Sequence, residues 1–469
     1  MAIQLLIIIL YFVITIAIGF YAKRKTTSSS AFHGAGLGVL LCVAAGTGEW
    51  LGGTSTTGVS EYGYTYGLSG AWYTIANGMG VCVLAIFFAK LYRSLDTVTV
   101  PGIIEKFIGK DARVVASVLL TFVMIAVGTA QVIAAGTLGV TVLGLNYVTS
   151  VIILGIGFIV YTLAGGMVAV AYTNVMHVVF MYGGVLVALF LTGSQIGGIG
   201  NIQNALPSEQ YFNWMNIGPS KVYSWIIASI LGACTAQAGI QPILAAKDVK
   251  VARKAAFVTA AVVAPFGIFT ALLGMMAKVQ FPQLANAKLA LPTLMMSLHP
   301  IAGGIVLASI MAAILSTVSP IILACGTMIS KDIYQRIMKP EAADREVLFV
   351  SRLITALSGV ISIILAIVMY GGTRILDIVY FAYTIRGSLF VVLLLGIYWK
   401  KTSSKGAVWA MLTTALVSIV WLIYNSIYGH YPIAGLNETY AAVVTAFVST
   451  ILFSLIFVKP EQGKITENR

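Results

Sequence analysis

The sequence predicts an all-α protein that crosses a membrane many times. Of its 469 residues, 59% are hydrophobic and only 9% are charged. A soluble domain carries about 25% charged residues, so the excess apolar surface requires lipid as its solvent. A helix that crosses the hydrocarbon layer needs about 20 mostly apolar residues. Thirteen stretches of the chain meet that requirement, and almost nothing remains for a soluble domain.

The thirteen predicted spans follow one another with short connections. Their expected bounds are 2–22, 36–60, 65–92, 112–143, 147–166, 168–193, 222–246, 252–278, 302–330, 346–370, 373–397, 406–428 and 438–458. The first span does not resemble a cleavable signal peptide, because its charges follow the apolar run and no small-residue cleavage site is present. The four cysteines are scattered inside the spans and show neither metal spacing nor a disulfide framework.

Positive charges alternate between the predicted loops. The net charge is +13, and 23 of the 28 lysine and arginine residues fall in loops on one side of the bundle, beginning with Lys23, Arg24 and Lys25. Such loops face the cytoplasm under the positive-inside rule. We therefore expect the N-terminus outside and the C-terminus in the cytoplasm, with the protein in the inner or plasma membrane. This distribution also favours a lipid bilayer over nucleic acid as the partner of the basic residues.

Two predicted spans are rich in residues that weaken helices. They contain the segments 46–58 (GTGEWLGGTSTTG) and 232–239 (GACTAQAG). Each glycine costs about 1 kcal/mol relative to alanine in a helix interior, and non-helical backbone is tolerated in a membrane only where it is buried or lines a cavity. A pair of interrupted helices in the two halves of a chain indicates a transport site near the midplane. The alternative is that the glycines only allow close helix packing.

Two charged residues, Glu49 and Arg386, are expected near the middle of the membrane. A charge there costs at least about 2.5–3.5 kcal/mol, so each should face the bundle interior and have a partner. Three interpretations stay open. The two residues pair with each other, or Arg386 binds a substrate carboxylate in a bidentate way, or Glu49 is a ligand of a cation or a proton.

The ninth span places three oxygen atoms on one helix face. The Ala313 carbonyl and the Ser316 and Thr317 hydroxyls occur at positions i, i+3 and i+4. Oxygen ligands of this kind suit a hard cation such as sodium. Serine and threonine also bond back to their own helix, so the pattern by itself is a weak signal.

Several segments, taken in order, resemble one transporter family. They are GVSEYGYTYGLSGAWY at 58–73, TVPGIIEK at 99–106, GGMVAVAYTNV at 165–175, the loop 241–253, ILST through KDIY at 314–334, and GIYWKK at 396–401. The chain resembles the sodium:solute symporter family, which includes the proline, pantothenate, sialic acid and sodium/glucose carriers. The match runs from about residue 5 to about residue 410.

The resemblance implies a leucine-transporter-like fold with two inverted five-helix repeats. The repeats are expected at 36–193 and 222–400. A flanking helix and loop at 1–35 would precede them, and two flanking helices with a short tail at 401–469 would follow.

The resemblance also implies that the coupling ion is sodium. Carried over residue by residue, its ligands are the carbonyls of Gly48, Leu51 and Ala313 and the hydroxyls of Ser316 and Thr317. They place the ion between the first and eighth core helices.

Two departures bear on a second sodium site. Members with that site carry an aspartate where this chain has Asn174, and one of the two nearby serines is here Pro320, with Ser319 retained. Loss of the carboxylate weakens cation binding, so we expect one sodium ion rather than two.

Taken together, these observations predict a sodium-coupled secondary transporter, functionally a monomer, that imports a small organic solute by alternating access. Arg386 favours a carboxylate-bearing solute such as an amino acid or an organic acid. The residues expected at the solute site are Gly52, Gly53, Thr54, Ser55, Trp72, Gln237, Arg386 and Glu49. The alternatives are a proton-coupled carrier that uses Glu49 and a solute-sensing membrane receptor. An enzyme is not expected, because no nucleophile–base constellation, metal cluster or cofactor loop is visible.

Overall fold

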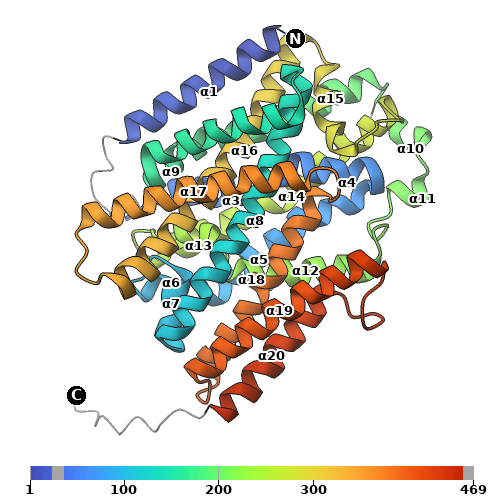
Figure 1. Ribbon diagram of the computed structural model, residues 1–469. Coiled ribbons are helices and arrows are strands. Elements are labelled where there is room, and N and C mark those ends of the chain that lie inside the picture. The colour runs from blue at the N-terminus through green and yellow to red at the C-terminus, as the bar shows by residue number, and fades with distance from the viewer. Residues whose placement is uncertain (1, 24–35, 199, 458–469) are drawn as a thin grey trace.

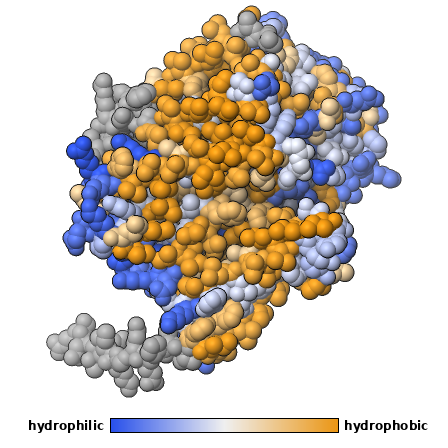
Figure 2. Space-filling view, in the orientation of Figure 1, coloured by the Kyte–Doolittle hydropathy of each residue, from blue (hydrophilic) through white to orange (hydrophobic). Residues whose placement is uncertain are grey.

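The structure is a bundle of helices. The computed structural model describes residues 2–23, 36–198 and 200–457, and within these ranges the β pairing is limited to an isolated bridge between Leu37 and Ala246. Long helices pack side by side, with short helices α10 and α11 gathered at one end and α6 and α7 at the other (Figure 1). Hydrophobic residues form a broad band across the visible face, bounded by hydrophilic patches (Figure 2). Such a band is the surface that a lipid bilayer requires.

The helices confirm a multi-pass membrane protein. Ten helical segments in the described part of the chain are long and apolar enough to cross a membrane. Shorter apolar helices lie at Ile3–Ile18, Val39–Trp50, Tyr147–Leu163 and Ala287–Met296. The number of thirteen spans stays a prediction.

The first half of the chain contains the first interrupted helix. Its elements are α1 (Ala2–Lys23), α3 (Val39–Trp50), η1 (Thr54–Gly58), α4 (Val59–Tyr66), η2 (Gly67–Ala71), α5 (Trp72–Val83), η3 (Leu84–Phe88), α6 (Ala89–Ser94), α7 (Val100–Phe107), α8 (Lys110–Leu143) and α9 (Tyr147–Gln195). The backbone leaves helical geometry at Leu51, where φ and ψ are −109° and 77°. It then re-enters through the π-helix η1, so the predicted interruption is confirmed.

The helix α9 joins two of the predicted spans, 147–166 and 168–193. Its helical assignment covers 49 residues, but the chain bends sharply inside it. The Tyr161 hydroxyl is hydrogen-bonded to the Thr173 hydroxyl, and the rings of Tyr161 and His177 lie 6.5 Å apart. In a straight helix with a rise of 1.5 Å per residue, positions 161 and 173 would be about 18 Å apart. The two parts of α9 therefore fold back toward each other, which agrees with two spans in this region.

The second half contains the second interrupted helix. Its elements are α10 (Asn201–Ala205), α11 (Ser208–Tyr211), α12 (Pro219–Ala233), α13 (Gln237–Leu244), α14 (Val249–Gln280), η4 (Ala287–Leu289), α15 (Ala290–Met296), α16 (Pro300–Met328), η5 (Ile329–Met338), α17 (Asp344–Met369), α18 (Ile375–Tyr398), α19 (Ser404–Tyr428) and α20 (Glu438–Ile456). The chain is non-helical between Ala233 and Gln237, inside the predicted segment 232–239.

The helix α16 forms the centre of the bundle. All of its residues from Gly303 to Met328 are buried except Ile305. It packs against α9, α8, α1, α17 and α3, whereas α17, α19 and α20 expose many large apolar side chains. A helix that is apolar all round is buried in this way, and its position brings it against the first interrupted helix.

Candidate functional site

The end of α3 meets α16 at the oxygen atoms expected to bind sodium. The Ser316 hydroxyl oxygen lies 2.8 Å from the Ala313 carbonyl oxygen. It also lies 3.2 Å from the Gly48 carbonyl oxygen and 3.5 Å from that of Leu51. The Thr317 hydroxyl donates a hydrogen bond to the Gly48 carbonyl. The structure therefore brings all five of these groups together.

The chemistry of this cluster fits a hard cation. Three carbonyl oxygens can only accept hydrogen bonds, and two hydroxyls have one proton each to donate. The hydroxyls of Ser316 and Thr317 are buried, with exposed fractions of 0% and 1%. Backbone carbonyls and hydroxyls can replace the hydration shell of a desolvated alkali cation. The five oxygens are thus a suitable ligand set for Na⁺.

Two glycines allow the broken helix to approach α16 this closely. A Cβ atom on Gly48 would lie 2.2 Å from the Asn174 Nδ2 atom and 3.1 Å from the Ser316 Cβ atom. A Cβ atom on Gly52 would lie 2.4 Å from the Thr317 hydroxyl oxygen. Any side chain larger than hydrogen at these two positions would push the carbonyl ligands away from α16.

Asn174 contacts the backbone of α16 next to the five oxygens. Its Nδ2 group donates a hydrogen bond of 3.3 Å to the Ser316 carbonyl, and its Oδ1 atom is buried and accepts no hydrogen bond from the described residues. The Ser319 hydroxyl accepts a hydrogen bond of 3.0 Å from Thr162. An amide at this position supplies a neutral oxygen where a carboxylate would supply a charge.

A second polar cluster lies beside the break, on the side of α5, α8 and α18. The Thr54 hydroxyl is 2.9 Å from the Tyr73 hydroxyl, which is 3.2 Å from the Tyr383 hydroxyl. Gln131 donates a hydrogen bond of 3.3 Å to Thr54. Cβ atoms added to Gly52 and Gly53 would lie 2.6 and 3.1 Å from the Oε1 atom of Gln131. Thr54 and the two glycines are therefore in one polar cluster.

The Ser55 hydroxyl is used to stabilise the broken backbone. It donates a hydrogen bond of 2.8 Å to the Gly52 carbonyl. Its own carbonyl accepts a hydrogen bond of 2.7 Å from Thr270 on α14. Ser55 thus connects the break to α14, next to the cluster around Thr54.

Arg386 on α18 is completely buried beside the same cluster. Its exposed fraction is 0%, and its guanidinium carbon lies 3.5 Å from the centre of the Tyr383 ring and 5.1 Å from that of Trp50. The Nε and Nη2 atoms have no hydrogen-bond partner among the described residues. The Thr235 hydroxyl, in the break between α12 and α13, donates to the Arg386 carbonyl. Arg386 therefore lies where the second broken helix meets α18.

Glu49 lies close to Arg386 without forming an ion pair with it. Its exposed fraction is 6%, and its Oε2 atom has no hydrogen-bond partner in the described part of the chain. The charges of Glu49 and Arg386 interact, yet the ion pairs formed by the described residues within 4.0 Å do not include these two. Direct pairing, one of the three open interpretations, is not made in this conformation.

Gln237 and Trp72 lie outside this cluster. The Gln237 side chain accepts a hydrogen bond of 2.7 Å from the Val100 amide and donates one of 3.2 Å to the Val98 carbonyl. It therefore fastens α13 to the segment before α7. Trp72 donates a hydrogen bond of 2.9 Å to the Trp214 carbonyl and packs edge-on against that ring. Both residues were expected at the solute site, and both have their polar atoms engaged elsewhere.

The structure adds polar residues that the sequence did not single out. Gln131 is buried in the middle of α8, and Tyr383 stacks on Tyr73. Asn77 lies one turn from Tyr73 on α5, and both of its side-chain polar atoms are buried without a partner among the described residues. The signal was available, because a polar residue in the middle of an apolar span is costly unless it serves a purpose.

Ion pairs close one end of the bundle around α7. Arg113 forms hydrogen-bonded ion pairs with Glu105 and Asp332, and Arg336 donates to Glu105 at 2.6 Å. Thr99 donates to Asp332 at 2.7 Å. Partial burial raises the pKa of Glu105, but the hydrogen bonds from Arg336 and Arg113 outweigh burial and hold this pKa below its ordinary value. The network joins α7 and α8 to η5.

A smaller hydrogen-bonded network joins both broken helices to α18. Tyr62 on α4 donates a hydrogen bond of 2.6 Å to Asp377 on α18. Lys221 on α12 lies 3.0 Å from the same carboxylate and 2.9 Å from the Tyr62 hydroxyl. The network thus ties α4 and α12, one part of each broken helix, to α18.

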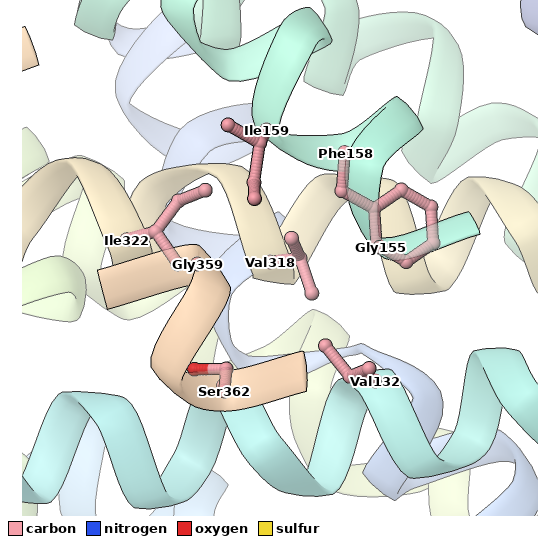
Figure 3. Close-up of a pocket in the computed structure, with 9 residues that line it drawn as sticks. Val132, Gly155, Phe158, Ile159, Val318, Ile322, Gly359 and Ser362 are labelled. Carbon is pink, nitrogen blue, oxygen red and sulfur yellow. The ribbon is translucent and has the colours of Figure 1, made fainter. Parts of the chain in front are cut away.

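The cavity drawn in Figure 3 is a packing defect rather than a polar binding site. It lies between α8, α9, α16 and α17, has a volume of about 10 Å³, and is lined by Gly128, Val132, Gly155, Phe158, Ile159, Val318, Ile322, Gly359 and Ser362. A space of this size holds about one water molecule at most. None of these nine residues belongs to the polar cluster around Thr54 and Arg386.

Comparison with known proteins assigns the chain to a family. The model of the sodium:solute symporter family matches residues 31–414. The chain belongs to the sodium:solute symporter family. The coupling ion is therefore sodium, and the protein is a membrane transporter rather than an enzyme.

Curated relatives of this symporter span most of its length. It is 25% identical over 471 residues to the high-affinity proline transporter PutP of Bacillus subtilis, covering 94% of each chain. It is 27% identical over 450 residues to the sodium/glucose cotransporter of Vibrio parahaemolyticus, covering 87% of this chain and 82% of the relative.

Solved structures give the same fold for this symporter. A Na⁺-coupled sialic acid symporter, solved in a substrate-bound outward-open state, superimposes with a TM-score of 0.80 at 19% identity and covers 98% of this chain and 99% of its own. MhsT in complex with L-phenylalanine superimposes with a TM-score of 0.57 at 15% identity, covering 89% and 98%. The leucine-transporter-like fold expected from the sequence is thereby confirmed.

Proposed function

We propose that this symporter imports a small carboxylate-bearing solute together with one sodium ion by alternating access. The observation that carries the proposal is the state of Arg386. It is fully buried, and its Nε and Nη2 atoms have no hydrogen-bond partner among the described residues. A buried cation without a counter-ion is costly, so these two donors require an anionic group that the solute supplies.

The free donors of Arg386 have the arrangement that a carboxylate requires. Nε and Nη2 form one edge of the planar guanidinium group, and an edge of this kind binds the two oxygens of a carboxylate with parallel hydrogen bonds. The rings of Tyr383 and Trp50 pack near the group, with their centres 3.5 and 5.1 Å from the guanidinium carbon. A Cβ atom on Gly232 would lie 2.8 Å from Nε, so a side chain at position 232 would displace this edge of the guanidinium group.

The proposed sodium ligands are the carbonyls of Gly48, Leu51 and Ala313 and the hydroxyls of Ser316 and Thr317. Two of these carbonyls belong to the broken helix that continues into Thr54. A bound ion would therefore order the backbone that lines the solute cluster. Ion and solute would each raise the affinity for the other by the same factor.

The proposed solute site contains Gly52, Gly53, Thr54, Glu49 and Arg386. Ser55 supports it through the backbone, whereas Gln237 and Trp72 are used in other contacts in this conformation. Two relatives support a carboxylate, because proline and sialic acid, the solutes in their names, both carry one. Glucose, in the name of a third relative, does not.

The proposed movement is a rocking of the repeat 36–193 against the repeat 222–400. The networks around Asp332 and Asp377 would open in turn, each releasing one end of the site. The positive-inside rule supports an orientation with the N-terminus outside and the C-terminus in the cytoplasm, and bacterial relatives support the plasma membrane.

The test is the thermal stability of the purified protein against a panel of carboxylates, sugars and polyols, in sodium and then in potassium. A ligand stabilises the state that it binds, so a carboxylate should raise the melting temperature in sodium and not in potassium. Arg386→Gln should weaken that carboxylate by about 10- to 150-fold, because a hydrogen bond to a charged group contributes about 1.5–3 kcal/mol.

A pair of glycine variants tests whether the carboxylate binds at the Nε–Nη2 edge of Arg386. Gly232→Ala should weaken carboxylate binding, because the added methyl group would lie 2.8 Å from Nε and displace the guanidinium group. Gly183→Ala, also in a long helix, adds a Cβ atom that meets nothing within 4 Å and should leave binding unchanged. Stabilisation by an uncharged solute alone, or equal carboxylate binding in Arg386→Gln, would contradict the proposal.

A further inference from the structure

Glu49 is the charged group that the proposed carboxylate contact leaves without a partner. Its side chain is 94% buried, since its exposed fraction is 6%, and its Oε2 atom accepts no hydrogen bond from any described residue. It directly precedes Trp50, whose ring lies 5.1 Å from the Arg386 guanidinium carbon. The helix end that carries Glu49 therefore contacts Arg386 through the neighbouring residue Trp50.

The two charges are near each other but not joined. Their charges interact, and both also act on the Tyr383 hydroxyl. The ion pairs that the described residues form within 4.0 Å do not include one between Arg386 and Glu49. A negative and a positive group therefore face one region, and each keeps an unused hydrogen-bonding atom.

We infer that the transported solute is a zwitterion, with its carboxylate on the Nε–Nη2 edge of Arg386 and its ammonium group on the Oε2 atom of Glu49. The inference rests on the proposed carboxylate contact of Arg386 and adds the opposite end of the solute. An α-amino acid carries both groups on one carbon atom, so a single small molecule can bridge the two side chains. The α-amino acids are therefore the substrate class that this site fits.

Solutes of other classes leave a buried charge unsatisfied. A carboxylate without an amine pairs Arg386 and leaves Glu49 without a donor, and an amine without a carboxylate does the reverse. A sugar offers hydroxyl groups but no charge to either side chain. Because an unpaired charge inside the membrane is costly, the solute that satisfies both groups binds with the highest affinity.

The side chain of such an amino acid would meet polar and aromatic groups. Asn77, on α5, has both side-chain polar atoms free of partners among the described residues. Tyr73 and Tyr383 close the region between α5 and α18 with their rings nearly parallel, at an interplanar angle of 25° and 6.3 Å between centres. These rings must separate for the solute to enter, which the opening of one end of the bundle would allow.

The test uses matched probes on the purified full-length protein in sodium. The twenty L-amino acids are screened by thermal stability, and the best one is compared with the 2-hydroxy acid and the primary amine that share its side chain. We expect the amino acid to bind at least about tenfold more tightly than either analogue, since each analogue lacks one charge-assisted contact.

A charge-removing variant assigns the ammonium contact to Glu49. In Glu49→Gln the affinity for the amino acid should fall about tenfold while that for the hydroxy acid stays the same, so that the difference between them disappears. Glu61→Gln is the matched control, because Glu61 is a second buried carboxylate on the same broken helix but accepts a hydrogen bond from the Ile375 amide. Sodium alone should still stabilise each variant, which shows that it is folded. Glu49→Asp, which keeps the charge, should keep part of the preference.

The outcomes distinguish the zwitterion inference from the proposed carboxylate contact of Arg386. If the wild-type protein binds the hydroxy acid as tightly as the amino acid, the zwitterion is wrong and the carboxylate contact of Arg386 stands. If Glu49→Gln retains the full preference for the amino acid, Glu49 is not the partner of the ammonium group. If sugars or polyols stabilise the protein in sodium and neither acid does, both the inference and the proposed function fail.

Discussion

Removal of one hydroxyl from the sodium cluster is the most direct test of the coupling site. Thr317→Ala deletes one of the two hydroxyls beside the carbonyls of Gly48, Leu51 and Ala313. The side chain is 1% exposed, so water cannot readily replace the missing ligand. The Gly48 carbonyl also loses the hydrogen bond that it accepts from Thr317.

The magnitude follows from these contacts. A hydrogen-bonding group next to a charge contributes about 1.5–3 kcal/mol, and 1.4 kcal/mol corresponds to a factor of ten. We therefore expect Thr317→Ala to bind sodium about 10- to 150-fold more weakly. Without sodium, loss of the bond to Gly48 should lower the free energy of unfolding by about 0.5–1.5 kcal/mol.

The assay is the sodium concentration that gives half-maximal thermal stabilisation, measured at zero and at saturating solute. Thr317→Ser is the matched control, because it retains the hydroxyl and loses only a methyl group. Linkage requires solute affinity to fall at low sodium and to recover at high sodium. An unchanged sodium midpoint in Thr317→Ala, or an equal loss in Thr317→Ser, would refute the assignment of this hydroxyl as a ligand.

The remaining predictions concern ion number and the closed end of the bundle. Asn174→Asp should raise the sodium Hill coefficient of uptake from about one towards two. The reason is that a carboxylate would replace the unpartnered amide oxygen of Asn174, next to Ser316. A coefficient near two in the wild type would contradict the one-ion proposal. Asp332→Asn should lower the free energy of unfolding by about 1–3 kcal/mol, measured by thermal unfolding, since the buried Asp332 pairs with Arg113. The pKa of Glu105 is lowered in the folded protein, so its stabilising effect is complete above its ordinary pKa of about 4.3 and is lost as the pH falls below it. Glu105→Gln should therefore reduce the acid sensitivity of the melting temperature, and an identical pH profile in the two proteins would exclude this role.

The broken helices were predictable because they depend on local composition. Glycine and small polar residues are concentrated at 46–58 and 232–239, and the chain leaves helical geometry inside both segments. The five oxygens near Ser316 were also anticipated, but through resemblance to a family. Periodicity alone placed three of them on one face of the ninth span and could not say which other helix faces them.

The bend inside α9 was also suggested by composition. Two spans, 147–166 and 168–193, were expected, and the contact between the Tyr161 and Thr173 hydroxyls shows that the chain bends sharply in this region. Hydropathy marks the two apolar windows, but only the packing of their side chains decides how the two parts lie against each other.

The sequence by itself determined that this chain lies in a membrane, where its helices break, and which buried charges need partners. Those features follow from the cost of placing polar backbone and charged side chains in hydrocarbon, which depends on residue type alone. Only the tertiary structure decided which groups meet. It directs Gln237 to the segment before α7 and Trp72 to Trp214, and it keeps Glu49 and Arg386 close but unpaired. A side chain's neighbours come from helices distant in sequence, so the direction in which each helix packs decides whether a polar residue fastens the fold or remains free for a solute.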